Sequence, residues 1–164
     1  GYMLFAIVSL GTYASSAVLT YATAYSLASV VAFTALLLVK KHTGSDQFIS
    51  FNGLSKSNPG LAVVVTIAML SLAGIPLTAG FIGKFMMFSS VMQDYHIILL
   101  ILAVVNAGIG VYYYLKVVVA IYFRSAEGEL VPIEIPLNFK LVLGISAIVT
   151  LLIGIYPDCI IKLL

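Results

Sequence analysis

Two lysines stand inside long apolar stretches of the chain, and their side chains are the ones best suited to chemistry. Lys84 stands near the end of a segment, residues 71–85, that holds three glycines and a proline, and Lys116 lies two residues after three consecutive tyrosines. A charged side chain is costly within a bilayer, so a lysine there often marks an ion or proton pathway. Desolvation and neighbouring charges then control its protonation. The chemistry that these residues predict is proton or ion transfer.

Each lysine also has a simpler interpretation. Lys84 precedes Met92 by eight residues, so its side chain could snorkel to the outer interface on a displaced helix. Lys116 precedes Arg124 by eight residues, roughly 12 Å along a helix, which a lysine side chain partly covers. For both lysines, snorkelling and membership of a proton relay stay open as alternatives.

Three further side chains are candidates to support a relay. Tyr112 and Tyr113 precede Lys116 by four and three residues and share its face of a helix. Asn106, in the middle of the same apolar run, could hydrogen-bond between helices or orient water. If Lys116 belongs to a relay, the two tyrosines would join it together with water. For Asn106, packing between helices is the favoured interpretation.

Other kinds of site have no support in the sequence. It contains no Gly-rich phosphate loop after a strand, no nucleophile–base motif and no metal-ligand spacing. One cysteine and two distant histidines do not make a metal site, and a net charge of +2 gives no reason to expect nucleic acid. We therefore expect no catalytic residue and no metal, and we expect Ser71 and Thr78 to bond with the backbone.

The composition indicates an all-α polytopic membrane protein. Hydrophobic residues make up 62% and charged residues 9% of the 164, whereas soluble domains carry roughly 25% charged residues. The apolar runs are continuous rather than alternating, which disfavours a transmembrane β-barrel. We treat residues 1–164 as one membrane domain. Because the opening residues look like the second half of a helix, we expect a C-terminal fragment of a longer protein.

About five membrane helices are expected, over residues 1–10, 15–39, 60–92, 97–123 and 139–156. The run 60–92 would extend nearly 50 Å as one straight helix, against a hydrocarbon core of about 30 Å. Pro76 removes a backbone donor and clashes with the preceding turn, so we predict that this helix is interrupted at Gly74, Ile75 and Pro76. Broken helices recur at ion sites in transporters, where freed carbonyls face a polar cavity.

The loops set the expected orientation. The loop that begins at Lys40 and Lys41 is the longest clearly polar one, and the positive-inside rule places it in the cytoplasm. Within it, residues 48–54 are apolar enough for a short interfacial helix lying on the surface. If 60–92 is a single pass, the second polar loop, residues 124–136, lies on the same side.

The segments around the two lysines resemble a known family. Met69-Leu-Ser-Leu-Ala-Gly-Ile-Pro76, Ala79-Gly-Phe-Ile-Gly-Lys-Phe85 and Val111-Tyr-Tyr-Tyr-Leu-Lys116 are similar to the C-terminal part of the subunit N family of bacterial complex I, the proton-pumping NADH:quinone oxidoreductase. The resemblance covers essentially the whole chain. It implies half of an antiporter-like inverted-repeat fold, in which Lys84 ends the central hydrophilic axis and Lys116 is a second basic position.

The resemblance also implies a function. The chain would take part in proton translocation, as a non-redox membrane subunit with no active site of its own in this segment. NADH oxidation and quinone reduction would occur elsewhere in the complex, and no cofactor would be bound here. Its partners would be the lipid bilayer and other membrane subunits of complex I, sister antiporter-like subunits among them, in the bacterial inner membrane.

Two other function classes compete with this one. A subunit of a multisubunit cation/proton antiporter would have the same fold, but Gly-Phe-Ile-Gly-Lys84 and the tyrosine run favour complex I. A purely structural membrane scaffold would leave Lys84 dispensable. The missing upstream sequence would discriminate between the first two, because a membrane-embedded glutamate and lysine pair is expected there.

Overall fold

The computed structural model describes residues 2–3, 14–93, 97–126 and 132–157, and this part of the chain is helical without strands. Three helices are long and apolar enough to cross a membrane, over Ser15–Thr43, Ile97–Phe123 and Leu137–Ile155. The elements, in chain order, are α2 (Ala14–Thr43), the 3-10 turn η1 (Phe48–Phe51), α3 (Leu54–Ser57), α4 (Pro59–Ala73), α5 (Ala79–Gln93), α6 (Ile97–Phe123) and α7 (Leu137–Ile155). The expected all-α membrane fold is confirmed.

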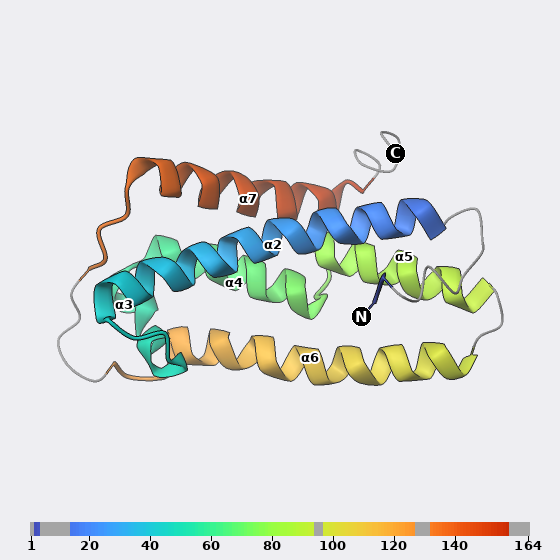
Figure 1. Ribbon diagram of the computed structural model, residues 1–164, viewed down its shortest axis with the longest axis horizontal. Helices are drawn as coiled ribbons and strands as arrows, with labels where there is room; N and C mark the ends of the chain where they lie inside the picture. Colours follow the sequence, from blue (N-terminus) through green and yellow to red (C-terminus); the bar gives the residue numbers. More distant parts are fainter. Residues whose placement is uncertain (1, 4–13, 94–96, 127–131, 158–164) are drawn as a thin grey trace.

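The interrupted helix is present as α4 and α5, which together make one pass through the bundle. Each has 15 residues, or roughly 22 Å of helix, so neither alone spans a hydrocarbon core of about 30 Å. Figure 1 shows them following one another along the length of the molecule, beside α6. Helix α2 packs against α4, α5 and α7 and therefore holds both half-helices in line.

The observed helix ends differ from the predicted ones at a few places. Helix α6 has the predicted bounds, but α2 continues to Thr43 and α7 begins at Leu137. The interruption covers residues 74–78, two more than predicted. The helix predicted over residues 1–10 lies outside the described residues, apart from Tyr2 and Met3.

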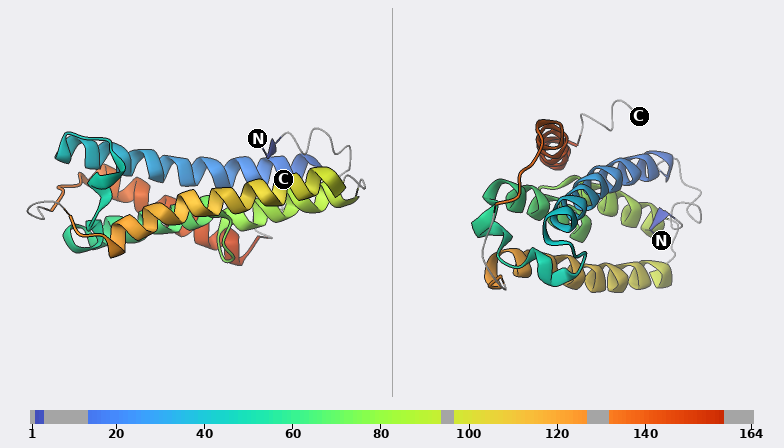
Figure 2. Two further views of the ribbon diagram at one scale, coloured as in Figure 1. Left: turned by 90° about the horizontal axis from the view of Figure 1, so that it is seen from below. Right: turned by 60° about the vertical axis from the view of Figure 1, so that its left-hand side comes forward.

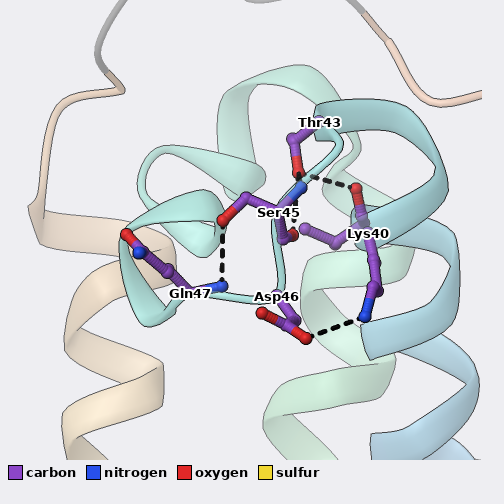
Figure 3. A network of polar contacts seen from close by, with 6 residues as sticks. Lys40, Thr43, Ser45, Asp46 and Gln47 are labelled. Atoms are coloured by element: carbon purple, nitrogen blue, oxygen red, sulfur yellow. Dashed lines mark hydrogen bonds and ion pairs between the residues drawn. The ribbon is translucent and has the colours of Figure 1, made fainter.

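Helix α2 is longer than predicted because its last turn is stabilised locally (Figure 3). Thr43 Oγ1 donates to the carbonyl of Val39 at 2.9 Å, and Lys40 pairs with Asp46 at 2.8 Å. The basic side chains there also interact favourably with the helix dipole. The hydrogen bond from Lys40 lowers the pKa of Asp46 below its ordinary value, so this carboxylate is ionised at neutral pH.

The two polar loops leave the bundle at the same end. In Figures 1 and 2 the end of α2, the end of α6 and the start of α7 lie together, as a single pass by α4 and α5 requires. The short surface helix expected over residues 48–54 is present only as the 3-10 turn η1, and the expectation that the whole segment lies on the surface is wrong. Gly53, with φ +70°, separates η1 from α3, and its N–H donates to the Ala120 carbonyl at 3.2 Å. Phe51 and Leu54 are buried against the bundle instead.

Close backbone approaches hold the half-helices in place. A Cβ on Gly83 of α5 would lie 2.8 Å from Cα of Tyr21 on α2. A Cβ on Gly154 of α7 would lie 2.5 Å from Cα of Thr78 and even nearer to the Leu77 peptide. Because real Cβ contacts are longer than this, glycine is required at both positions. Helix α7 therefore closes over the interruption between α4 and α5.

Gly154→Ala should destabilise the protein, because its methyl group would push the backbone of Leu77 and Thr78 away from α7. The matched control is Gly144→Ala on the same helix, where an added Cβ meets no atom within 4 Å. We expect Gly154→Ala to cost about 1–3 kcal/mol, the range of overpacking mutations. Thermal unfolding of the full-length protein in detergent measures it. Equal melting temperatures for the two variants would contradict the close contact.

Candidate functional site

The interruption begins with a glycine cap on α4. Gly74, with φ +82°, donates its N–H to the carbonyls of Leu70 and Ser71 at 2.9 and 3.0 Å, and the N–H of Ile75 also returns to Leu70 at 3.0 Å. This is the left-handed C-cap that glycine favours. The next residue, Pro76, has no N–H, so the Leu72 carbonyl lacks the donor that a continuing helix would supply.

Lys84 satisfies the carbonyls that the interruption leaves without backbone donors. Its Nζ donates to the carbonyl oxygen of Leu72 at 2.7 Å and to that of Ala73 at 2.9 Å. The residue is 7% exposed and lies one turn into α5. An ammonium group at this position also meets the negative end of the α4 dipole. The structure therefore buries Lys84, and snorkelling to the interface is wrong for it.

Two side-chain hydrogen bonds at the interruption fix this geometry. Ser71 Oγ accepts the N–H of Gly80 at 3.1 Å, and Thr78 Oγ1 donates to the Ile75 carbonyl at 2.7 Å. Ser71 and Thr78 are both buried and bond with the backbone, as predicted. The Ser71 bond ties the end of α4 to the start of α5, and the Thr78 bond holds the backbone between them, so the two carbonyls and the lysine keep their separation.

Lys84 borders a cavity of about 250 Å³ between α2, α4, α5 and α6. A volume of this size admits several water molecules at about 30 Å³ each. Tyr2 stands at the same cavity, with its ring centroid 5.4 Å from the Nζ of Lys84, a cation–π distance. The polar side chains that line the cavity are Tyr2, Tyr21, Tyr25, Ser71, Lys84, Asn106, Tyr113 and Tyr114.

The predicted supporting residues divide into two groups. Asn106 and Tyr113 line the cavity with Lys84, whereas Tyr112 and Lys116 do not. Lys116 is exposed on this chain, with its Nζ 5.4 Å from the ring centroid of Phe48. Tyr112 is 66% exposed and packs edge-on against Tyr113. The described residues therefore do not connect Lys84 with Lys116, and a relay role for Lys116 stays a prediction.

Sequence reasoning missed the tyrosines of α2 and the one at the start of the chain. Tyr21 and Tyr25 are four residues apart and so lie on one face of α2, with ring centroids 6.1 Å apart. That spacing was readable in the sequence, but which face of α2 meets Lys84 depends on the packing of α2 against α5. That packing depends on Gly83, because the absence of a side chain there allows the backbone of Tyr21 to approach closely.

The arrangement suits proton exchange at the lysine nitrogen. An ammonium group has three donors, and the carbonyls of Leu72 and Ala73 use two of them. A neutral amine retains two N–H groups and gains a lone pair. Lys84 can therefore keep both carbonyl bonds in either charge state and exchange its third proton with water in the cavity. Within the described ranges no three His, Cys, Asp or Glu side chains are grouped to hold a metal.

Comparisons with known proteins give a consistent result. Residues 1–110 match the family model described as NADH:quinone oxidoreductase/Mrp antiporter, TM. The chain is 38% identical to NADH-quinone oxidoreductase subunit N of Trichlorobacter lovleyi, over 99% of this chain and 34% of that protein. It is 34% identical to subunit N of Flavobacterium psychrophilum, over 92% of this chain and 33% of that protein. The chain spans about a third of the length of the curated relatives it matches.

A solved structure agrees with these sequence matches. A chain of respiratory complex I from Thermus thermophilus, determined with bound aureothin, superposes with a TM-score of 0.81 at 26% identity. The alignment covers 98% of this chain and 36% of that chain. The interrupted helix and its neighbours are therefore similar to part of a known membrane assembly.

Gly74→Ala tests the geometry of the site. Alanine is strained at φ +82°, and its Cβ would lie 2.8 Å from Cδ of Lys84. We expect a loss of stability of at least about 1–2 kcal/mol from the left-handed backbone alone, together with displacement of the Lys84 ammonium. Gly108→Ala on α6, where an added Cβ meets no atom within 4 Å, is the control. Thermal unfolding of the full-length protein is the measurement, and equal stability of both variants would contradict this account.

Proposed function

The chain belongs to the NADH:quinone oxidoreductase/Mrp antiporter transmembrane family, and from this premise we propose that it is part of a proton-translocating membrane subunit of a bacterial complex I. The relatives from Trichlorobacter lovleyi and Flavobacterium psychrophilum, both named NADH-quinone oxidoreductase subunit N, support this choice within the family. So does the likeness to a chain of Thermus thermophilus complex I.

One observation carries the proposal: a buried lysine held by two freed backbone carbonyls beside a cavity with room for several water molecules. Lys84 takes up a proton from water in the cavity and gives it back, while the carbonyls of Leu72 and Ala73 keep its nitrogen in place. Asn106 and Tyr113 order that water from α6. Because the acceptor bonds persist in both charge states, the lysine needs no large movement to exchange its proton.

The energy for translocation comes from the rest of the proposed complex. NADH oxidation and quinone reduction take place on other subunits, and this chain binds neither molecule nor any redox cofactor. Its partners are other membrane subunits of complex I, among them sister antiporter-like subunits, and the lipid of the bacterial inner membrane. The loop after Lys40 and Lys41 faces the cytoplasm, in accordance with the positive-inside rule.

A cation/proton antiporter subunit is the second candidate, and the family description names that class as well. A secondary antiporter would move protons against another cation without NADH. Its activity would therefore depend on a cation gradient rather than on electron transfer. Membranes that hold the full-length protein distinguish the two functions when they are energised first by NADH and then by a sodium gradient.

Lys84→Ala, made in the full-length subunit, should abolish most NADH-driven proton pumping in membrane vesicles while the complex still assembles. The variant removes the exchanging nitrogen and leaves the Leu72 and Ala73 carbonyls without their donor. Pumping is followed with a pH-sensitive dye, and assembly by native electrophoresis. Near-normal pumping would contradict the proposal and favour the structural scaffold.

Lys116→Ala provides the comparison within the same chain. Lys116 does not line the cavity and lies over the ring of Phe48, so we propose that it joins the relay only through groups beyond the described residues. The expected result is a smaller loss of pumping than in Lys84→Ala, in the same vesicle assay. Equal losses would show that the two lysines act in one continuous path and would contradict the division seen here.

A further inference from the structure

A second hollow of the molecule lies far from Lys84, between the end of α2 and the segment that leads into α7. Its volume is about 710 Å³, and apolar side chains such as Leu37, Ile135 and Phe139 form its walls. Three polar side chains also face it, Lys41 and His42 from α2 and Glu134 from the opposite wall. None of these residues borders the cavity of Lys84.

The wall that carries Glu134 is a built feature of the fold. The side chain of Asn58 donates to the Ile133 carbonyl at 2.9 Å and accepts the Ile133 N–H at 2.8 Å. Pro132 and Pro136 restrict the backbone on both sides of this pair. Ile133 is buried, so the segment is fixed to the start of α4. Glu134 therefore lies on an irregular segment whose backbone is held in place next to the hollow.

The charges at the hollow are unpaired within the described part of the chain. Lys40 Nζ forms an ion pair with Asp46 Oδ2 at 2.8 Å. No other ion pair is found among the described residues. Lys41 and Glu134 both line the hollow, yet neither forms an ion pair there. The hollow thus offers one cation and one anion, on opposite walls, to a molecule that carries both charges.

The position of the hollow at the ends of two membrane helices indicates that this molecule is a lipid. Lys41 and His42 lie in the last turn of the apolar span Ser15–Thr43, and the apolar span Leu137–Ile155 begins just after Glu134. The hollow therefore opens where both helices leave the hydrocarbon region, at the level of lipid headgroups. Apolar walls below charged rims match a phospholipid, whose acyl chains and headgroup require these two environments.

We propose that this hollow binds phosphatidylethanolamine, with its phosphate on Lys41 and its ammonium on Glu134. The acyl chains lie along Leu37 and Phe139. Phosphatidylglycerol carries the phosphate but no cation for Glu134, and phosphatidylcholine has a quaternary ammonium that donates no hydrogen bond. The structure thus predicts a preference among headgroups, and this preference does not depend on the proposed role of Lys84.

The test is the lipid retained by the intact, full-length assembly after purification in mild detergent. Native mass spectrometry, with extraction and headgroup analysis, gives the ratio of phosphatidylethanolamine to phosphatidylglycerol in bound lipid. The variants are Glu134→Gln, which removes only the anion, and Lys41→Gln, which removes only the cation. Lys56→Gln is the matched control, because Lys56 is an exposed lysine on α3 that does not line the hollow.

Glu134→Gln should lower the ratio by roughly fivefold, as expected for one charge contact near a membrane surface, while phosphatidylglycerol still binds. Lys41→Gln should weaken retention of both lipids, and Lys56→Gln should leave the ratio at the wild-type value. A wild-type ratio equal to that of the bulk membrane would overturn the proposal. So would an unchanged ratio in Glu134→Gln, or the absence of bound lipid because another segment of the full-length chain fills the hollow.

Discussion

The hydrogen bonds from the buried Lys84 ammonium to the carbonyls of Leu72 and Ala73 are the interaction on which the rest of the structure depends. They exist because Pro76 cannot donate to the Leu72 carbonyl and because Gly74 turns the chain out of the helix. A buried polar group without a partner costs on the order of 1–3 kcal/mol. The lysine and the interruption thus satisfy one another, and each lowers the free-energy cost of burying the other.

The surrounding helices keep this pair together and leave one side open to water. Ser71 on α4 accepts the N–H of Gly80 on α5. Gly83 allows the backbone of α2 to approach α5, and Gly154 allows α7 to pack directly on the interruption. Helix α6 stands on the other side of the cavity and contributes Asn106 and Tyr113 to it. This division provides fixed backbone around the nitrogen and, beside it, a cavity with room for water, which are the two conditions for repeated proton exchange at a fixed position.

Much of this could be predicted from the sequence, because the strongest signals are local. The length of the run 60–92 required an interruption, Pro76 placed it, and the bounds of α6 followed from one continuous apolar run. The burial of Lys84 could not be predicted, since a lysine eight residues from a helix end can also snorkel. Its partners are backbone carbonyls, which carry no sequence signal. The surface helix failed at Gly53, because its bond to Ala120 is a tertiary contact.

The central claim is that Lys84 keeps both carbonyl bonds while its nitrogen changes charge. Solid-state NMR of the full-length protein in lipid tests it most directly, with lysine labelled by ¹⁵N at Nζ and leucine and alanine labelled by ¹³C at the carbonyl. The account predicts Nζ–carbonyl correlations from Lys84 to Leu72 and Ala73 at both ends of its titration, with a nitrogen shift that moves from ammonium to amine. Correlations that vanish when the lysine is neutral, or that never appear, would contradict it.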